Sequence, residues 1–510
     1  MANTTLPNSP APSWTALMQG TQLQYGPITC ESYGANPLNT AAENTAAIAQ
    51  ALTTGGMVTL MRPGTYVCAD SFAPSTHLVI GPGVLLQTAT GGPVTTLRAY
   101  SVPMIATLPA QTLAVVGDSY TSQYANNDGN FFYNNADGYL TWALALSGQR
   151  LSIISSPARA NSRISAAASS PGVIFSQQVD TAIASGANNV LIMGGVNDCF
   201  AGFSFTQITV AYEQCLQKAV ASGMRVWACT QPTMNAAFGS YSVAIQGTLF
   251  AVNEWLREYV ATTYARYGVT VVDLAAVAVA PASATGDYKS NYTQDGLHPR
   301  NLGAYFMGKE LARVWNLFIP EANRLLSSAA DSYSYSSLIR QGQTNGLMTA
   351  SGGGVATGLT LATIVGASSV NTVDARSDGF GNDQTMTITS TANNDGYRLE
   401  STTVHANGFA SGDVIQAECE ITVSSITNYR GEFLQLIGNA SVANRGGYNG
   451  FVDTTNDAAL TEGYTVVRRT PPITLSGSPT SVRIRIDTNF SGVGGATVKV
   501  GRFSIRRLNT

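Results

Sequence analysis

The stretch "VIFSQQVDTAIASGANNVLIMGG", residues 173–195, decides the fold class of the middle of the chain. Its first half places Phe175, Val179, Ala182 and Ile183 on one face of a helix that Gly186 can end. Its second half, "NNVLIMGG", is an apolar run of the length expected for a buried strand. The stretch therefore predicts a helix, a glycine turn and a buried strand in succession.

The same succession occurs twice more along the chain. The helical pattern of residues 206–223 precedes the apolar run "RVWACTQP" (225–232), and that of residues 250–268 precedes "VTVVDL" (269–274). Repeated helix–glycine–strand units predict a parallel sheet with helices on both faces, which is an α/β/α architecture. Functional groups of such sheets gather at the carboxyl ends of the strands.

Three polar residues lie directly after predicted strands, namely Ser119, Asn197 and Gln231. A serine hydroxyl becomes a useful nucleophile only when a base lies within hydrogen-bond reach. The predicted α/β region holds one histidine, His298 in "QDGLHPR", three residues after Asp295. Residues three apart in a turn or a first helical turn lie on the same side, so this segment can deliver both a base and its orienting carboxylate. Asn197 is expected in a loop just after its strand, where its amide can donate to a developing oxyanion.

These residues occur in three short motifs. The motifs resemble the first, third and fifth blocks of the SGNH (GDSL-type) hydrolases, in the family's order, over roughly residues 110–320. They are Gly117-Asp118-Ser119, Gly195-Val196-Asn197-Asp198 and Asp295-Gly296-Leu297-His298-Pro299. "GYLTWALAL" (138–146) is also similar to the helix that follows the nucleophile in this family.

The resemblance implies a role for each matching residue. Ser119 would be the nucleophile, His298 the general base and then acid, and Asp295 the group that holds the imidazole. The backbone N–H of Ser119 and the side chain of Asn197 would belong to the oxyanion hole. The family's second block supplies a glycine N–H to that hole, but the matching "NSRISAAA" (161–168) has Ala166 there. Arg163 in the same segment could bind substrate oxygens, and an ordinary solvated arginine is the alternative.

The segments that flank this region have a different character. Residues 1–24 form a Pro- and Asn-rich arm, and residues 25–108 combine one Ala-rich helix with short apolar runs. "GGMVTLMRPGTYV" and "LVIGPGVLLQ" in the second segment resemble the entry to the right-handed β-helix of phage tailspikes and pectate-lyase-like proteins, here as a short neck. The hydrolase-like region spans residues 109–325, and a Ser/Tyr-rich linker follows at 326–340.

The last segment, residues 341–510, alternates apolar and polar residues between Gly, Asn and Ser turns, which predicts a β-sandwich. It resembles the jelly-roll, carbohydrate-binding-like modules at the ends of phage tail proteins, where it could bind glycan or support oligomerisation. The predicted fold class is thus multidomain α/β plus β.

Composition excludes several classes of function. Charged residues make up only 11% of the chain against a typical 25%, and the net charge of -3 provides no basic field for nucleic acid. No apolar run is long enough to span a membrane, and the amino terminus lacks the pattern of a secretory signal. The six cysteines form no CxxC pair, so we expect buried free thiols, no disulfides, and neither a metal nor another cofactor. Trp142 and Trp227 are expected to be core residues rather than sugar-binding platforms. Cys199, beside Asn197, is expected to pack in the core rather than to act as a second nucleophile, and His77 and His405 receive no role.

Together these features predict a serine esterase that removes O-acetyl groups from bacterial surface polysaccharide, either capsule or O-antigen. The tailspike resemblance implies a virion protein that acts outside the host cell as a homotrimer, with other phage tail proteins as partners. A general bacterial carbohydrate or carboxyl esterase is one alternative. A receptor-binding adhesin is another, with Ala166 as the lesion that removed activity. A lyase or glycosidase in residues 25–108 is weaker, because glycosidases use a positioned acidic pair and carboxylates are few there.

Overall fold

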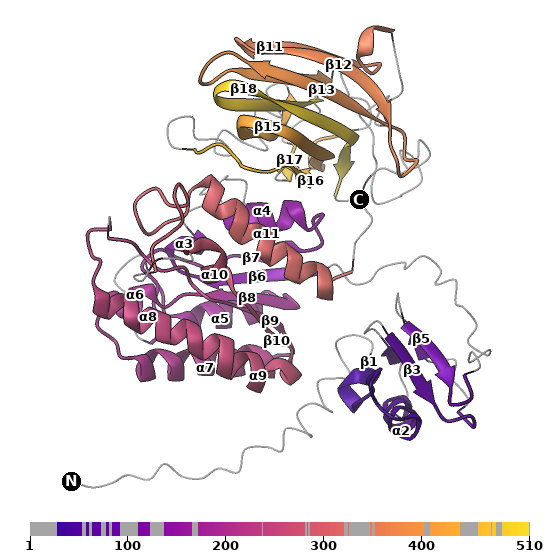
Figure 1. Cartoon of the computed structure of the whole chain (residues 1–510), viewed down its shortest axis with the longest axis vertical. Coiled ribbons are helices and arrows are strands. Elements are labelled where there is room, and N and C mark those ends of the chain that lie inside the picture. Colours follow the sequence, from indigo (N-terminus) through magenta and orange to yellow (C-terminus); the bar gives the residue numbers. More distant parts are fainter. Residues whose placement is uncertain are drawn as a thin grey trace. The chain divides into compact units, whose positions relative to one another are not determined.

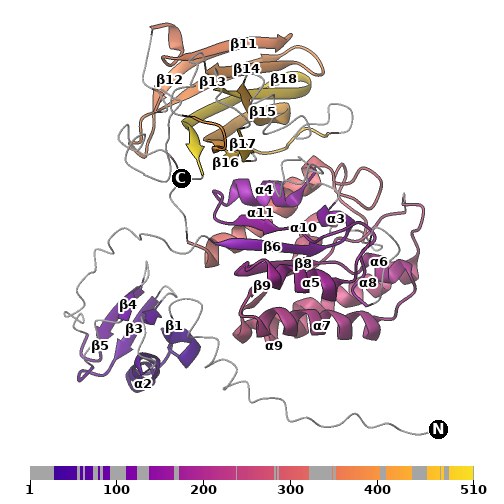
Figure 2. The same ribbon diagram turned by 180° about the vertical axis from the view of Figure 1, so that it is seen from behind.

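The structure is a computed structural model, shown in Figures 1 and 2. It describes residues 28–53, 58–60, 64–72, 78–80, 84–91, 111–122, 137–165, 172–236, 238–280, 283, 286–320, 325, 347–348, 352–401, 409–438, 457–470, 472–475 and 482–508. Contacts divide the chain into two compact units, one of residues 1–110 and one that contains nearly all residues from 111 onward. Ala166, His77, His405 and the predicted arm at 1–24 lie outside the described residues.

The first unit combines one helix with short parallel strands. Helix α2 (Ala41–Leu52) begins with a capping box, in which Thr40 and Glu43 satisfy each other's backbone N–H groups. Strands β1 (Ile28–Thr29), β2 (Val58–Leu60) and β4 (Leu78–Ile80) form one parallel sheet, and β3 (Gly64–Cys68) and β5 (Val84–Thr88) pair in another. Parallel strands are what a β-helix requires, and the assignment of this segment as a β-helix stays a prediction.

The second unit begins with the predicted parallel sheet. The five strands run in the order β10-β9-β8-β6-β7, and every neighbouring pair is parallel. They are β6 (Thr112–Gly117), β7 (Ser152–Ser155), β8 (Asn189–Met193), β9 (Arg225–Cys229) and β10 (Val269–Val272). The α/β expectation is confirmed, because the three apolar runs quoted above are the parallel strands β8, β9 and β10.

Helices cover both faces of this sheet. Helices α4 (Tyr139–Leu146) and α11 (Asn301–Phe318) lie on one face, and α5 (Phe175–Ala184) and α7 (Phe205–Ala221) lie on the other (Figures 1 and 2). Gly186 and Gly223, which were expected to end helices, have φ values of 72° and 79°, a left-handed conformation that suits glycine. The predicted third helix begins earlier, at Val243 in α8 (Val243–Trp255), and continues through a π turn at Leu256–Val260.

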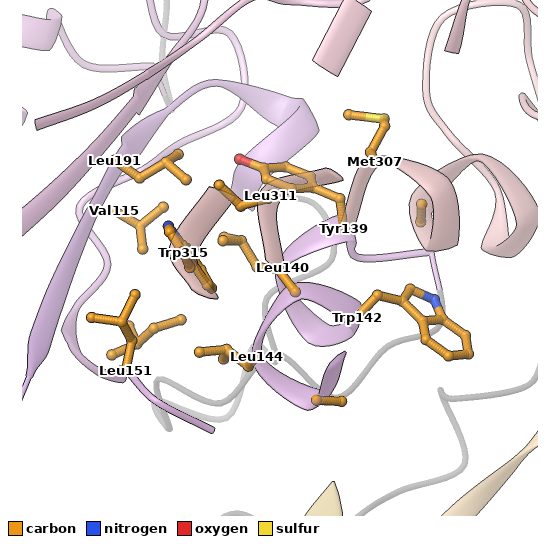
Figure 3. Packing of buried hydrophobic residues seen from close by; sticks show 14 of the residues in the cluster. Val115, Tyr139, Leu140, Trp142, Leu144, Leu151, Leu191, Met307, Leu311 and Trp315 are labelled. Atoms are coloured by element: carbon orange, nitrogen blue, oxygen red, sulfur yellow. The ribbon is translucent and has the colours of Figure 1, made fainter. Parts of the chain in front are cut away.

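Helices α4 and α11 pack closely on each other and on the sheet. Leu140 and Leu144 of α4 meet Leu311 and Trp315 of α11 above strand residue Val115 (Figure 3). The two helices approach at Gly308, where an added Cβ would lie 2.4 Å from Trp142 Cβ and 2.6 Å from the Tyr139 carbonyl oxygen. A side chain at position 308 would therefore force the helices apart.

The carboxyl-terminal part of the second unit is an antiparallel β-structure, in agreement with the alternating sequence pattern. Strands β15 (Val414–Gly438) and β18 (Val482–Arg507) pair along most of their lengths, with register shifts between Glu418 and Gly431. The other strands are β11 (Leu359–Val365), β12 (Ser368–Ala375), β13 (Asn382–Ser390), β14 (Gly396–Ser401), β16 (Tyr464–Arg469) and β17 (Ile473–Thr474). The jelly-roll assignment stays a prediction.

This β-structure packs against the outer side of α4 and α11. The Trp142 ring meets Tyr464 of β16 edge to face at 5.5 Å between ring centroids, and the Arg468 guanidinium lies 4.7 Å from the centre of the Trp142 ring. The Tyr305 hydroxyl of α11 donates to the Glu462 carboxylate at 2.7 Å. Trp142 is thus fully buried, as expected of a core residue, and Tyr464 and Arg468 of the carboxyl-terminal strands contact its ring.

Two further expectations can be compared with the structure. All six cysteines are buried free thiols, as predicted. None of the helices in the described ranges is both long and apolar enough to cross a membrane.

Candidate active site

Strand β6 delivers Ser119 to the carboxyl edge of the sheet. The strand ends at Gly117, and Ser119 begins the short helix α3 (Ser119–Ser122). The turn between them is held by the Asp118 carboxylate, which accepts the N–H of Tyr120 at 3.1 Å. An added Cβ at Gly117 would lie 2.6 Å from Thr121 Oγ1, so the turn requires glycine there. The Gly-Asp-Ser motif is therefore a strand-to-helix turn that presents the serine side chain.

The structure brings the three predicted catalytic residues together. The His298 ring places Nε2 2.9 Å from the Ser119 hydroxyl oxygen, across 179 positions of sequence. Its Nδ1 lies 2.7 Å from Oδ2 of Asp295. The other Asp295 oxygen accepts the backbone N–H groups of His298 at 2.7 Å and of Leu297 at 2.9 Å. This is the hydrogen-bond relay of a serine nucleophile, a base and an orienting carboxylate.

The electrostatics of the Asp295–His298 pair favour the working protonation state. Partial burial would raise the pKa of Asp295, but hydrogen bonds from the His298 ring and from the N–H groups of His298 and Leu297 lower it to about 2. An ionised carboxylate beside Nδ1 favours the proton on that nitrogen. Nε2 is then free to accept the proton of Ser119.

Two buried tyrosines that the sequence analysis did not single out support the histidine turn. The Tyr288 hydroxyl lies 2.8 Å from the Leu297 carbonyl oxygen and 3.2 Å from the Tyr120 hydroxyl, and it donates its one hydrogen to either of them. The Tyr120 hydroxyl lies 3.1 Å from the Pro232 carbonyl oxygen, and its ring lies 5.7 Å from the His298 ring. The residue after the nucleophile and the residue before the base thus lie within hydrogen-bond distance of one buried hydroxyl, that of Tyr288.

The Asn197 amide lies on the same edge of the sheet. It is the second residue of helix α6 (Val196–Phe200), not part of a loop as expected, because Gly195 with a φ of 131° turns the chain directly into the helix. Asn197 Nδ2 donates to the Ser162 carbonyl oxygen at 3.1 Å. That nitrogen carries two hydrogens, so one remains for a substrate oxygen.

Asp198, the next residue, ties the second motif block to the third. Its carboxylate accepts the N–H of Ile164 at 2.9 Å and the N–H of Ser165 at 2.8 Å. Both amides are therefore occupied and do not serve the oxyanion hole. The role of Ala166 in that hole stays a prediction.

Gln231, which follows a predicted strand, connects two turns of the site through hydrogen bonds. It is fully buried, its Nε2 donates to Asp118 at 2.7 Å, and its Oε1 accepts the Val196 N–H at 2.8 Å. Gln231 thus sets the distance between the nucleophile turn and the Asn197 turn. Burial raises the pKa of Asp118 to about 6, against the hydrogen bonds from Gln231 and Tyr120. A polar residue directly after an apolar strand was the available signal.

Three other residues considered in the sequence have clear surroundings. Burial raises the pKa of Cys199 to about 12, so this thiol packs in the core and is no second nucleophile. Trp227 is fully buried. Arg163 is half-buried, in the segment that supports Asn197. Within the described ranges, no three His, Cys, Asp or Glu side chains form a group that could hold a metal ion.

Comparison with known proteins agrees with this geometry. Residues 115–305 match the model of the GDSL-like Lipase/Acylhydrolase family, and this part of the chain is a GDSL/SGNH hydrolase domain. Among curated proteins, none matches the chain.

The chain is also similar to several solved structures. Est24, a carbohydrate acetylesterase from Sinorhizobium meliloti, is 15% identical with a TM-score of 0.32, and the match covers 41% of this chain and all of that one. The inhibitor-bound aryl esterase of M. smegmatis is 16% identical with a TM-score of 0.30, over 40% of this chain and 98% of that one. A member of the lipolytic protein G-D-S-L family from Veillonella parvula is 14% identical with a TM-score of 0.29, over 40% and 97%.

Proposed function

We propose that the protein hydrolyses carboxylic esters with Ser119 as the nucleophile. The observation that carries this proposal is the unbroken relay of 2.9 Å from Ser119 to His298 and 2.7 Å from His298 to Asp295. A structural serine, a structural histidine and a turn aspartate have no reason to meet in this order. The assembled relay also favours an enzyme over an adhesin that has lost its activity.

The chemistry follows from the positions of these groups. The Ser119 oxygen attacks the ester carbonyl carbon while its proton passes to His298 Nε2, and Asp295 stabilises the imidazolium. The tetrahedral oxyanion accepts hydrogen bonds from the Ser119 N–H and the Asn197 amide. His298 then returns the proton to the leaving alkoxide, and the alcohol departs from the acyl-enzyme. Water attacks the acyl-enzyme with His298 again as base, which releases the carboxylic acid and restores Ser119.

The substrate that we propose is an O-acetyl ester on bacterial surface polysaccharide. The setting that we propose is a phage tail, where a homotrimer meets other tail proteins and acts outside the host cell. Support comes from the tailspike-like sequence of residues 25–108, the antiparallel module after the hydrolase domain, and the low charge of the chain. A general bacterial carbohydrate or carboxyl esterase would use the same site on other esters.

The test is acetate release from O-acetylated bacterial polysaccharide by the wild type, Ser119→Ala and Ser122→Ala. Ser122 lies in the same short helix and is the matched control. We expect release by the wild type and by Ser122→Ala, and none by Ser119→Ala. Turnover of a chromogenic acetate ester without polysaccharide activity would keep the esterase and reject the polysaccharide. A wild type inert on both substrates would reject the proposed function, and a monomer in light scattering would reject the homotrimer.

A further inference from the structure

Arg163 is held beside the Asn197 amide by its own backbone. Its neighbour Ser162 accepts the Asn197 amide through the carbonyl oxygen, and the next residue, Ile164, donates its N–H to Asp198. The Arg163 carbonyl oxygen accepts the N–H of Phe175 at 2.9 Å, at the start of α5. Hydrogen bonds of Ser162 and Ile164 thus fix the backbone of Arg163 from both of its neighbours in the chain.

Among the described residues, the Arg163 side chain has no partner for its charge. Ser162 and Ile164 point into the core and are each 1% exposed, whereas Arg163 between them is half-buried. Its Nε is buried without a hydrogen-bond partner, and within the described residues its guanidinium makes no ion pair. Every other arginine in the described ranges has a hydrogen bond, an ion pair or an aromatic ring contact. A buried donor that bonds to nothing is unfavourable and calls for an explanation.

The carboxylates of the site are already occupied. Both oxygens of Asp198 accept hydrogen bonds from the Ile164 and Ser165 segment. Asp118 is bound by Gln231 and Tyr120 from inside the sheet, and Asp295 is bound by His298. Burial raises the pKa of Asp198, and the hydrogen bonds from Ser165 and Ile164 and the charge of Arg163 only partly oppose that rise. Arg163 and Asp198 form no ion pair with each other. None of these three carboxylates pairs with Arg163, so an anion for its guanidinium would be supplied by a ligand.

We propose that Arg163 binds a carboxylate of the substrate, so that the ester cleaved at Ser119 sits on an acidic sugar. The guanidinium presents its N–H groups as a planar fork that matches the two oxygens of a carboxylate. A carboxylate on the same sugar unit as the ester, or on the next one, can occupy this position while the ester carbonyl faces Asn197. This assignment deepens the proposed function and rests on it.

The experiment compares one polymer in two charge states. O-acetylated polygalacturonate carries a carboxylate on each sugar, and carbodiimide amidation converts these groups to neutral carboxamides. The kcat/KM for acetate release is measured on both forms, and the readout is the ratio of the acidic form to the amidated form. The enzymes are the wild type, Arg163→Gln, Arg163→Lys and Arg159→Gln. Arg159 lies in the same loop but is exposed, and its guanidinium bonds to the Ser156 and Ala158 carbonyls.

We expect Arg163→Gln to lower this ratio by roughly 10- to 100-fold, the effect of losing one charge-assisted contact. Arg163→Lys keeps the charge without the fork and recovers part of the ratio. Arg159→Gln leaves the ratio and the activity of the wild type unchanged. High salt lowers the ratio of the wild type, because salt screens the ionic contact between the half-buried Arg163 and the substrate carboxylate.

Two results would overturn the assignment while leaving the esterase intact. One is a wild type that cleaves both polymers with equal kcat/KM, and the other is an Arg163→Gln variant that loses both activities to the same extent. Hydrolysis of 4-nitrophenyl acetate, abolished by Ser119→Ala, is measured in parallel to separate the two proposals. If the wild type fails on that small ester as well, the proposed function fails and the Arg163 assignment fails with it.

Discussion

Asn301 joins the catalytic histidine turn to the carboxyl-terminal β-structure, and its replacement should show what that contact contributes. It is the first residue of α11, fully buried, and lies three residues after His298. Its Nδ2 donates to the Ala458 carbonyl oxygen at 2.7 Å, and its Oδ1 accepts the Ala458 N–H at 2.9 Å. The segment of Ala458 is held in turn by the β-structure, where Leu460 donates its N–H to the Tyr429 carbonyl at 2.8 Å.

Asn301→Ala removes both hydrogen bonds and leaves the N–H and the C=O of the partly buried Ala458 without these partners. Each unsatisfied group of this kind costs about 1–3 kcal/mol when it is buried, so we expect a loss of about 2–6 kcal/mol at most in the free energy of unfolding. The start of α11 then loses its anchor close to His298. We therefore expect kcat on a small acetate ester to fall about tenfold. A tenfold fall corresponds to a loss of about 1.4 kcal/mol in transition-state stabilisation.

The assay is urea unfolding followed by tryptophan fluorescence, together with kcat on the small ester. Asn316→Ala is the matched control, because Asn316 is exposed on the same helix and should change stability by less than about 0.5 kcal/mol. An Asn301→Ala variant with the wild-type unfolding midpoint would refute the stability argument. A variant that is less stable but keeps the wild-type kcat where it is fully folded would refute the link to His298.

Two further predictions concern packing and pH. Gly308→Ala should destabilise the protein by about 1–3 kcal/mol, because its Cβ would lie 2.4 Å from Trp142 Cβ. The control is Gly247→Ala on α8, where a Cβ meets open space and the change should be neutral or slightly stabilising. Equal unfolding midpoints for the two variants would contradict this prediction. The lowered pKa of Asp295, about 2 against 3.8, contributes stability that is complete above about pH 4 and is lost as the pH falls toward 2. Asp295→Asn should remove this loss of stability between about pH 4 and pH 2, as measured by the free energy of unfolding at each pH. It should also lower kcat by roughly 10³- to 10⁴-fold. An unchanged loss of stability at low pH would mean that Asp295 is not the group responsible.

The local parts of the site were predictable from the chain. Asp295 and His298 lie three residues apart, so a single turn brings them together, and the sequence shows this directly. Ser119 and Asn197 follow apolar runs of strand length, and a parallel sheet places such positions on one edge. The helix–glycine–strand repeats therefore indicated both the fold of the hydrolase domain and the edge where its chemistry occurs.

The supporting residues could not be predicted in the same way. Gln231, Tyr120 and Tyr288 act through partners far away in sequence, such as the 113 positions between Gln231 and Asp118. The place of Gln231 after an apolar strand indicated the edge of the sheet but not its partners, and Tyr120 and Tyr288 carried no signal, because a buried tyrosine occurs in any core where its hydroxyl finds a partner. Asn197 was expected in a loop, because the chain pattern does not reveal that Gly195 leads directly into a helix.

The sequence by itself determined the parallel sheet, the order of its strands and helices, and the three residues of the relay, because hydrophobic periodicity and short motifs are local properties. Only the tertiary structure decided what surrounds them. Trp142 reads as an ordinary core residue of a short helix, yet Tyr464 and Arg468 from more than 300 positions away complete its environment. Arg163 reads as a surface arginine, and only the folded chain shows that Asp118, Asp198 and Asp295 are bound by other groups. Which polar groups find partners depends on packing between distant segments, and the local sequence pattern does not contain that packing.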